Sequence, residues 1–145
     1  MTSENAAAIR HHAVSLGTRM TLISGESPVG VAAELFYTTH DPLALHLGLA
    51  IDGSPAVEWV FARNLLRDGL TIPSGSGDIH IFPVPQGVVI DLLSPHGTAR
   101  LLADARELAG FVDQMYVTVA DGDESPYMDL DHELASLQEM QFPFL

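Results

Sequence analysis

Apolar and polar residues alternate through the first half of the chain with the two-residue period of β-strands. This alternation predicts strands over residues 14–22, 31–37, 43–51 and 57–62. It is cleanest in the third segment, where one face would carry five apolar side chains: Leu43, Leu45, Leu47, Leu49 and Ile51. Turn signals at 39–42 and at Asp52-Gly53-Ser54 separate the segments, so consecutive strands should pair as antiparallel neighbours.

The segment Val57–Pro83 predicts a strand, a short helix, a loop and a second strand in close succession. Trp59 and Phe61 share one face of the first strand and are expected to be core residues. Residues 63–68 favour a single helical turn, and Gly69 follows where a helix commonly ends in the left-handed conformation. The run Pro73-Ser74-Gly75-Ser76-Gly77 predicts turns, and residues 78–82 return to the strand period.

Two arginines lie four residues apart on this short helix. Arg63 and Arg67 are expected either to be solvated or to pair with Glu58 and Asp68. Neither alternative indicates a functional role.

The period changes after two further strands, which are predicted at 88–93 and 98–102. Residues 104–119 carry apolar positions at the spacing of an amphipathic helix: Leu108, Phe111, Val112, Met115, Tyr116 and Val119. Asp104 fits the N-cap of this helix, with Glu107 three residues later as a partial capping box. Asp121-Gly122-Asp123 should end it, and Ser125 and Pro126 can begin a final acidic helix over 125–141.

Together these elements predict an α+β fold in one domain of 145 residues. A loose arm at 1–12 would precede an antiparallel meander at 14–102, closed or nearly closed as a small β-barrel, with the short helix near 63–68. The helix at 104–119 would cover the sheet, and the acidic helix at 125–141 would follow it.

The charge of the chain narrows the classes of partner. There are 19 acidic residues against six basic ones, a net charge of −13, and all six bases are arginine. Such a surface repels nucleic-acid phosphates and anionic membranes. Cysteine is absent, and no apolar run is long enough to span a bilayer or to act as an N-terminal leader. We therefore expect a cytoplasmic protein that does not insert into the membrane.

The candidates for catalytic or ligand chemistry are each incomplete. His11-His12 and His40-Asp41 lack the spacing of a metal site, and residues 129–133 lack the glycine and later ligands of a calcium loop. His80 and Asp91 accompany serines at 76 and 94, but no nucleophile elbow is present. We expect no catalytic, metal-binding or cofactor-binding residues, and hence a protein that is not an enzyme.

Several short motifs occur in an order that is hard to obtain by chance. They are Ala33-Glu34-Leu35-x-Tyr37, Asp41-Pro42, the Val57–Pro83 block, Gly87-Val88-Val89, Leu93-Ser94-Pro95-x-Gly97-x-Ala99-x-Leu101-Leu102 and Ala105-Arg106-x-Leu108-x-x-Phe111. Through them the chain resembles the SsgA-like family of sporulation and cell-division proteins of actinobacteria. The segment Asp129-Leu130-Asp131-x-Glu133-Leu134 looks most like the SsgB branch of that family.

The resemblance implies a barrel similar to the Whirly proteins, a homotrimer, and a non-enzymatic regulator of sporulation-specific division. Its partners would be other SsgA-like or septum-associated proteins and the tubulin-like protein FtsZ, which it would recruit or position at the division septum. The alternative is a Whirly-like module that binds single-stranded nucleic acid. Because six arginines spread from Arg10 to Arg106 provide no basic cluster, we expect no nucleic-acid partner.

Among the departures of the chain from the family pattern, two in one motif change the chemistry of a side chain. Where the family usually has Asp-Val-Arg-Val-Trp-Pro, this chain has His80 and Phe82 in place of the arginine and the tryptophan. These two residues are candidate partner contacts. The other candidates belong to the acidic C-terminal segment and to the glycine through which it joins the chain: Gly122, Asp129, Asp131 and Glu133.

Overall fold

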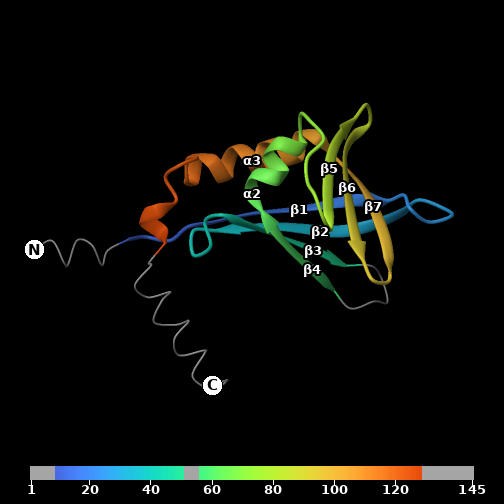
Figure 1. Cartoon of the computed structure of the whole chain (residues 1–145), viewed down its shortest axis with the longest axis horizontal. Helices are drawn as coiled ribbons and strands as arrows, with labels where there is room; N and C mark the ends of the chain where they lie inside the picture. The colour runs from blue at the N-terminus through green and yellow to red at the C-terminus, as the bar shows by residue number, and fades with distance from the viewer. Residues whose placement is uncertain (1–8, 51–55, 129–145) are drawn as a thin grey trace, which may run out of the picture.

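The computed structural model describes residues 9–50 and 56–128. Within them, strands and helices follow one another as β1 (Ala13–Leu22), β2 (Val29–Thr38), β3 (Ala44–Ala50), β4 (Val57–Ala62), α2 (Arg63–Gly69), β5 (Ile79–Val84), β6 (Gly87–Ser94), β7 (Gly97–Ala103), α3 (Ala105–Thr118) and a 3₁₀ turn, η1 (Ser125–Tyr127) (Figure 1). Every strand predicted from the alternation is present, as are the helices predicted at 63–68 and 104–119. Their ends differ from the prediction by at most two residues within the described ranges, and Ile51, the predicted last residue of the third strand, lies outside them. The predicted turn at 52–54 lies outside the described residues.

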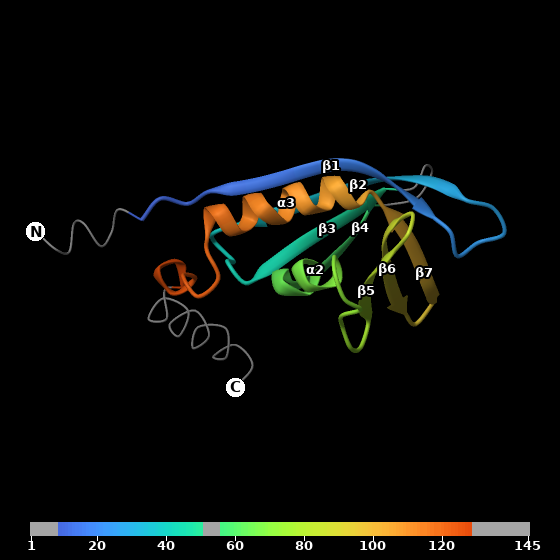
Figure 2. The ribbon, with the colours of Figure 1, turned by 90° about the horizontal axis from the view of Figure 1, so that it is seen from above.

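The strands form one antiparallel sheet in the order β4-β3-β2-β1-β7-β6-β5. β1 to β4 make one meander and β5 to β7 make a second, and the two join where β1 pairs with β7 at Thr21 and Leu22. Figures 1 and 2 show the second meander turned steeply against the first, so that the sheet bends like half of a barrel.

The prediction of a closed or nearly closed barrel needs correction. β4 and β5 lie at opposite ends of the strand order, and the described residues contain no pairing between them. α2 follows β4 directly and packs against β5, so a helix occupies the position where a closing strand pair would form. The barrel is therefore open on this side.

The core lies between the sheet and α3. The predicted stripe of α3 is buried at Leu108, Phe111, Val112 and Met115, and it meets inward side chains of both meanders: Val31, Leu35, Tyr37, Leu45, Leu47, Ile81 and Ile90. Phe61 is buried in this core and Trp59 packs against it, as expected. The carboxylate of Asp104 accepts a hydrogen bond of 3.0 Å from the Glu107 N–H, which confirms the predicted N-cap.

Gly69 is required for a reason other than the predicted left-handed conformation. It is the last residue of α2, and Leu70 continues with helical dihedral angles. A Cβ atom at Gly69 would overlap the side chain of Ile81 and lie 3.0 Å from the Ile81 carbonyl oxygen. The glycine therefore allows α2 to approach β5 closely.

Gly122 does adopt the left-handed region, with φ of 91°. It lies in a turn closed by a hydrogen bond of 2.9 Å from the Asp123 N–H to the Ala120 carbonyl oxygen. The segment beyond begins with the 3₁₀ turn η1 rather than the predicted α-helix, and Met128 after it is extended. Glu124, not Ser125, occupies the N-cap of η1, and most of the predicted helix at 125–141 lies outside the described residues.

Candidate protein-interaction surface

The structure places the two candidates of the family motif on one face of β5. His80 and Phe82 are two residues apart and both half-buried. The strand register sets Asp91 of β6 beside His80, and Arg100 of β7 beside Asp91. We call these four residues, His80, Phe82, Asp91 and Arg100, the His80–Arg100 face.

A bidentate ion pair fixes the cation of this face. The Nε and Nη2 atoms of Arg100 each donate a hydrogen bond of 2.8 Å to one carboxylate oxygen of Asp91. Asp91 is only 8% exposed, whereas the Arg100 side chain is 48% exposed. These hydrogen bonds raise the pKa of Arg100. The guanidinium is thus held in one orientation while one side of it remains open to a partner.

An aromatic ring and a histidine adjoin this cation. The Arg100 guanidinium carbon lies 5.6 Å from the centroid of the Phe82 ring, within the range of a cation–π contact. The Nε2 atom of His80 lies 3.0 Å from the carbonyl oxygen of Gly77, which ties the ring to the loop before β5. Sequence reasoning missed Asp91 and Arg100 as members of this face, because only the register of β5, β6 and β7 brings them together.

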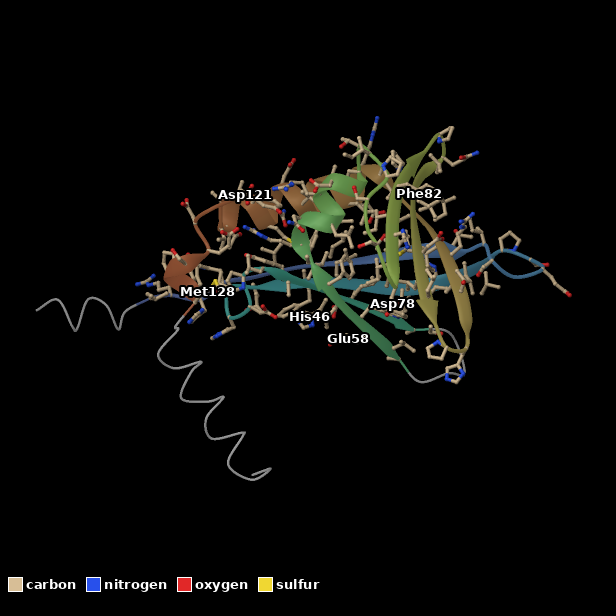
Figure 3. All side chains as sticks on the ribbon, viewed as in Figure 1. His46, Glu58, Asp78, Phe82, Asp121 and Met128 are labelled. Carbon is tan, nitrogen blue, oxygen red and sulfur yellow. The ribbon has the colours of Figure 1, made fainter. Side chains whose placement is uncertain are left out.

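Gly122 belongs to a second location, at the end of α3. Figure 3 shows Asp121 in this region and Phe82 well apart from it on β5. The other candidates, Asp129, Asp131 and Glu133, lie outside the described residues. The structure therefore unites His80 and Phe82, separates them from Gly122, and leaves the acidic candidates untested.

Arg63 organises this second location. Its side chain is 2% exposed, so it is neither solvated nor paired with Glu58 as predicted. Its guanidinium donates hydrogen bonds to the carbonyl oxygen of Val119 at 2.8 Å and to the carboxylate of Glu124 at 2.7 Å. It also lies over the Tyr116 ring, 4.0 Å from the centroid. We call Arg63, Tyr116, Val119 and Glu124 the Arg63 junction.

The ionisation of the Arg63 junction follows from these contacts. The hydrogen bond from Arg63 lowers the pKa of Glu124. Burial raises the pKa of Tyr116, against the opposing effect of the nearby arginines. Arg67 pairs with Asp68 at 3.0 Å, as predicted, and also reaches Asp121 at 3.1 Å. The first residues after α3 are thus held to α2 by one buried and one half-buried cation.

The outer face of β2 to β4 carries exposed apolar side chains that the sequence did not single out. Phe36 is 38% exposed and Val60 is 51% exposed. The register places His46 between them. The rings of His46 and Phe36 meet edge-on, with their centroids 6.2 Å apart. His46 also contacts the carboxylate of Glu58 at 3.2 Å (Figure 3). This face is a second candidate for protein contacts.

The histidines considered for metal binding come together only in part. The rings of His11 and His40 stack with centroids 3.7 Å apart, and Nδ1 of His11 lies 3.0 Å from the hydroxyl of Thr39. In residues 9–50 and 56–128, no group of three or more His, Cys, Asp or Glu side chains could hold a metal ion. No helix in the same part of the chain is long and apolar enough to cross a membrane.

Comparison with known proteins identifies the relatives of this chain. Residues 31–124 match the family model described as Streptomyces sporulation and cell division protein, SsgA. The sporulation-specific cell division protein SsgB of Streptomyces coelicolor is 43% identical over 120 residues, which cover 80% of this chain and 88% of the relative. The crystal structure of an SsgA-like sporulation-specific cell division protein from Thermobifida fusca matches with a TM-score of 0.78 at 35% identity, covering 86% of this chain and 95% of the other. A chain solved in a study of SsgB mutations that correlate with longitudinal cell division during sporulation of Streptomyces coelicolor matches with a TM-score of 0.76 at 38% identity, covering 81% and 97%. The half-barrel with its covering helix is thus shared with solved SsgA-like structures, and the chain belongs to the SsgA family of sporulation and cell-division proteins.

Proposed function

We propose that this chain is a non-enzymatic regulator that recruits or positions FtsZ at division septa through protein–protein contacts. The observation that carries the proposal is the identity of 43% over 120 residues with a sporulation-specific cell division protein. FtsZ is the tubulin-like polymer of the bacterial division machinery, and a regulator of septation has to act on such machinery by binding. The protein would therefore work in the cytoplasm at the septum.

The His80–Arg100 face supports a contact role. Arginine and aromatic residues are enriched among the residues that contribute most to protein interfaces. Here Asp91 fixes the orientation of Arg100 before any partner arrives, and Phe82 provides apolar area beside it. A side chain that is ordered in advance loses less conformational entropy on binding. Arg100 and Phe82 are accordingly the contacts we assign first.

We also propose that the protein is a homotrimer. The exposed Phe36 and Val60 lie on an outer face that no element covers in the described residues, and β4 has a strand neighbour on one side only. Exposed sheet edges and apolar faces are commonly covered by association. Light scattering coupled to gel filtration should give three times the 15.6 kDa of one chain. A monomeric mass would contradict this part of the proposal.

The cellular test is the position of FtsZ in sporulating cells of the host. Deletion of the gene should leave fluorescent FtsZ without regularly placed rings, and the wild-type gene should restore them. Phe82→Ala should restore them poorly, because it removes apolar contact area from the His80–Arg100 face without touching the core cluster. Glu26→Ala, exposed between β1 and β2, is the matched control and should act as wild type. Regular rings in the deletion strain would refute the proposal.

A further inference from the structure

β1 has a free edge along most of its length. It pairs with β2 over all ten residues but with β7 only at Thr21 and Leu22. In the described part of the chain, no strand lies on the β7 side of residues 13–20. This segment is therefore an internal edge of the bent sheet.

The hydrogen bonds at the two ends of β1 show which of its residues direct their backbone groups toward this edge. On the β2 side, the carbonyl oxygen of His12 accepts a hydrogen bond from the Thr39 N–H. On the β7 side, the Ile23 N–H donates a hydrogen bond to the carbonyl oxygen of Arg100. The backbone N–H and C=O groups of successive residues in a strand point to alternate sides. The odd-numbered residues of β1 therefore present these groups away from β2. Ala13, Ser15 and Gly17 thus offer hydrogen-bonding groups to the free edge.

α3 runs alongside this edge of β1 (Figure 2) and lines two hollows together with it. One hollow of about 440 Å³ lies between residues 13–15 of β1 and the C-terminal half of α3, including Asp113, Gln114 and Val117. A second hollow of about 250 Å³ shares Ser15 and Gln114 with the first and continues past Gly110 toward Arg106. The two make one continuous groove, the β1–α3 groove.

Two glycines have open surroundings in the described part of the chain: Gly110, which lines the groove, and Gly17, which lies on β1 two residues beyond Ser15. A Cβ atom at Gly110, in the middle of α3, would meet nothing within 4 Å, and the same holds for Gly17 in β1. Neither residue has a positive φ. Glycine weakens both a helix interior and a strand interior. Their lack of side chains does, however, let another backbone approach α3 at Gly110 and the free edge of β1 at Gly17, and close backbone approach is a common reason for glycine within a strand.

The groove walls define the chemistry of an occupant. Val117 is 86% exposed, the most exposed large apolar side chain of the described residues. Asp113 is exposed, and it makes no ion pair with any residue in 9–50 or 56–128. In a chain with a net charge of −13, such a groove favours a basic residue over an acidic one.

We infer that the β1–α3 groove binds an extended segment of the partner protein, which adds to β1 as a further strand. This mode of recognition takes its affinity from main-chain hydrogen bonds and its specificity from alternate side chains. The segment would place an apolar side chain against Val117 and a basic one against Asp113. The inference rests on the proposed function, with FtsZ as the partner, and assigns that contact a surface separate from the His80–Arg100 face.

Two variants test the groove by different means in co-sedimentation with polymerised cognate FtsZ. Gly110→Gln fills the groove from the α3 wall, and the fold should tolerate it because the position is open and glutamine favours helix. Ser15→Pro removes an N–H from the free edge but leaves the pairing with β2 intact. Each should weaken binding about ten-fold or more. Ala105→Gln, exposed at the start of the same helix, is the control and should bind as wild type.

The outcomes separate the groove from the proposed function. Binding by wild type and by both groove variants alike would overturn the groove and leave the function standing. Absence of binding by wild type would contradict both. Hydrogen exchange supplies a second measurement: the amides of Ser15 and Gly17 should exchange rapidly in the protein alone and slow down on FtsZ polymers. Slow exchange already in the protein alone would assign the groove to a second copy or to the chain's own C-terminal segment, and would also overturn the inference.

Discussion

Arg63 joins three parts of the chain that are distant in sequence. It begins α2, contacts carbonyl oxygens at the end of α3, and pairs with Glu124, which is 61 positions away. No local pattern around Arg63 indicates these partners, because their distance depends on how α2 and α3 pack on the sheet. Sequence analysis therefore predicted a solvated or locally paired arginine, whereas it correctly predicted the short-range pair of Arg67 with Asp68.

Removal of the Arg63 charge should destabilise the protein strongly. In Arg63→Met, Glu124 loses its partner and the Val119 carbonyl loses a donor. We expect the free energy of unfolding to fall by about 1.5–3 kcal/mol, the range for hydrogen bonds to charged groups. Arg67→Met, at an exposed pair on the same helix, should cost at most about 1 kcal/mol. Urea denaturation of both variants measures the difference, and equal losses would contradict a special role for Arg63.

The Arg63 junction should also make stability depend on pH. The pKa of Glu124 is lower in the folded protein than its ordinary value of 4.5. The unfolded state therefore binds the proton more tightly, so this contribution is complete above pH 4.5 and is lost as the pH falls through the folded pKa. Glu124→Gln should flatten that part of the stability curve in urea titrations between pH 6 and pH 3. An identical pH dependence in the variant and the wild type would contradict the assignment.

Gly69 and Gly110 form a matched pair for testing the close approach of α2 to β5. Gly69→Ala should destabilise the protein by about 1–3 kcal/mol because the new methyl group overlaps Ile81. Gly110→Ala should leave stability unchanged or raise it by up to about 1 kcal/mol, since the site is open and alanine favours helix. The melting temperature of Gly69→Ala should therefore fall, whereas that of Gly110→Ala should stay the same or rise. A stable Gly69→Ala protein would contradict the packing explanation.

At the scale of elements, hydrophobic periodicity was sufficient to locate the strands and helices. The alternation in β2 and β3 and the stripe of α3 each correspond to a buried face in the structure. The opening of the barrel was not predictable in this way. It follows from the position of α2 between β4 and β5, and periodicity does not report how far apart two edge strands lie.

The turn at Gly122 controls how the C-terminal segment leaves α3. Its φ of 91° is strained for any residue with a side chain, although space for a Cβ atom is available. Gly122→Val should destabilise the folded turn by about 1–3 kcal/mol. Hydrogen-exchange protection over residues 119–128 should fall as a result. Gly17→Val, in a strand with ordinary φ and open surroundings, is the control and should not reduce protection there. Unchanged protection in Gly122→Val would show that the turn does not position the segment.

At the scale of the whole molecule, the candidate contacts could be predicted only in part. His80 and Phe82 were predicted from the sequence, and the structure places them on one face, but Asp91 and Arg100 join them only through strand register. The β1–α3 groove likewise depends on the small overlap between β1 and β7, which no sequence pattern reports. Function at this scale rests on membership of the SsgA family and on a strongly acidic surface, both of which favour a protein partner over nucleic acid.

The most direct test of the central claim is co-sedimentation of the wild-type chain with cognate FtsZ. With GTP present, FtsZ polymers should carry the chain into the pellet in a saturable manner, and without polymer the chain should remain in the supernatant. Binding that is weak but saturable would be sufficient, because transient contacts of division regulators bury little surface. A chain that stays in the supernatant at every FtsZ polymer concentration would contradict the account.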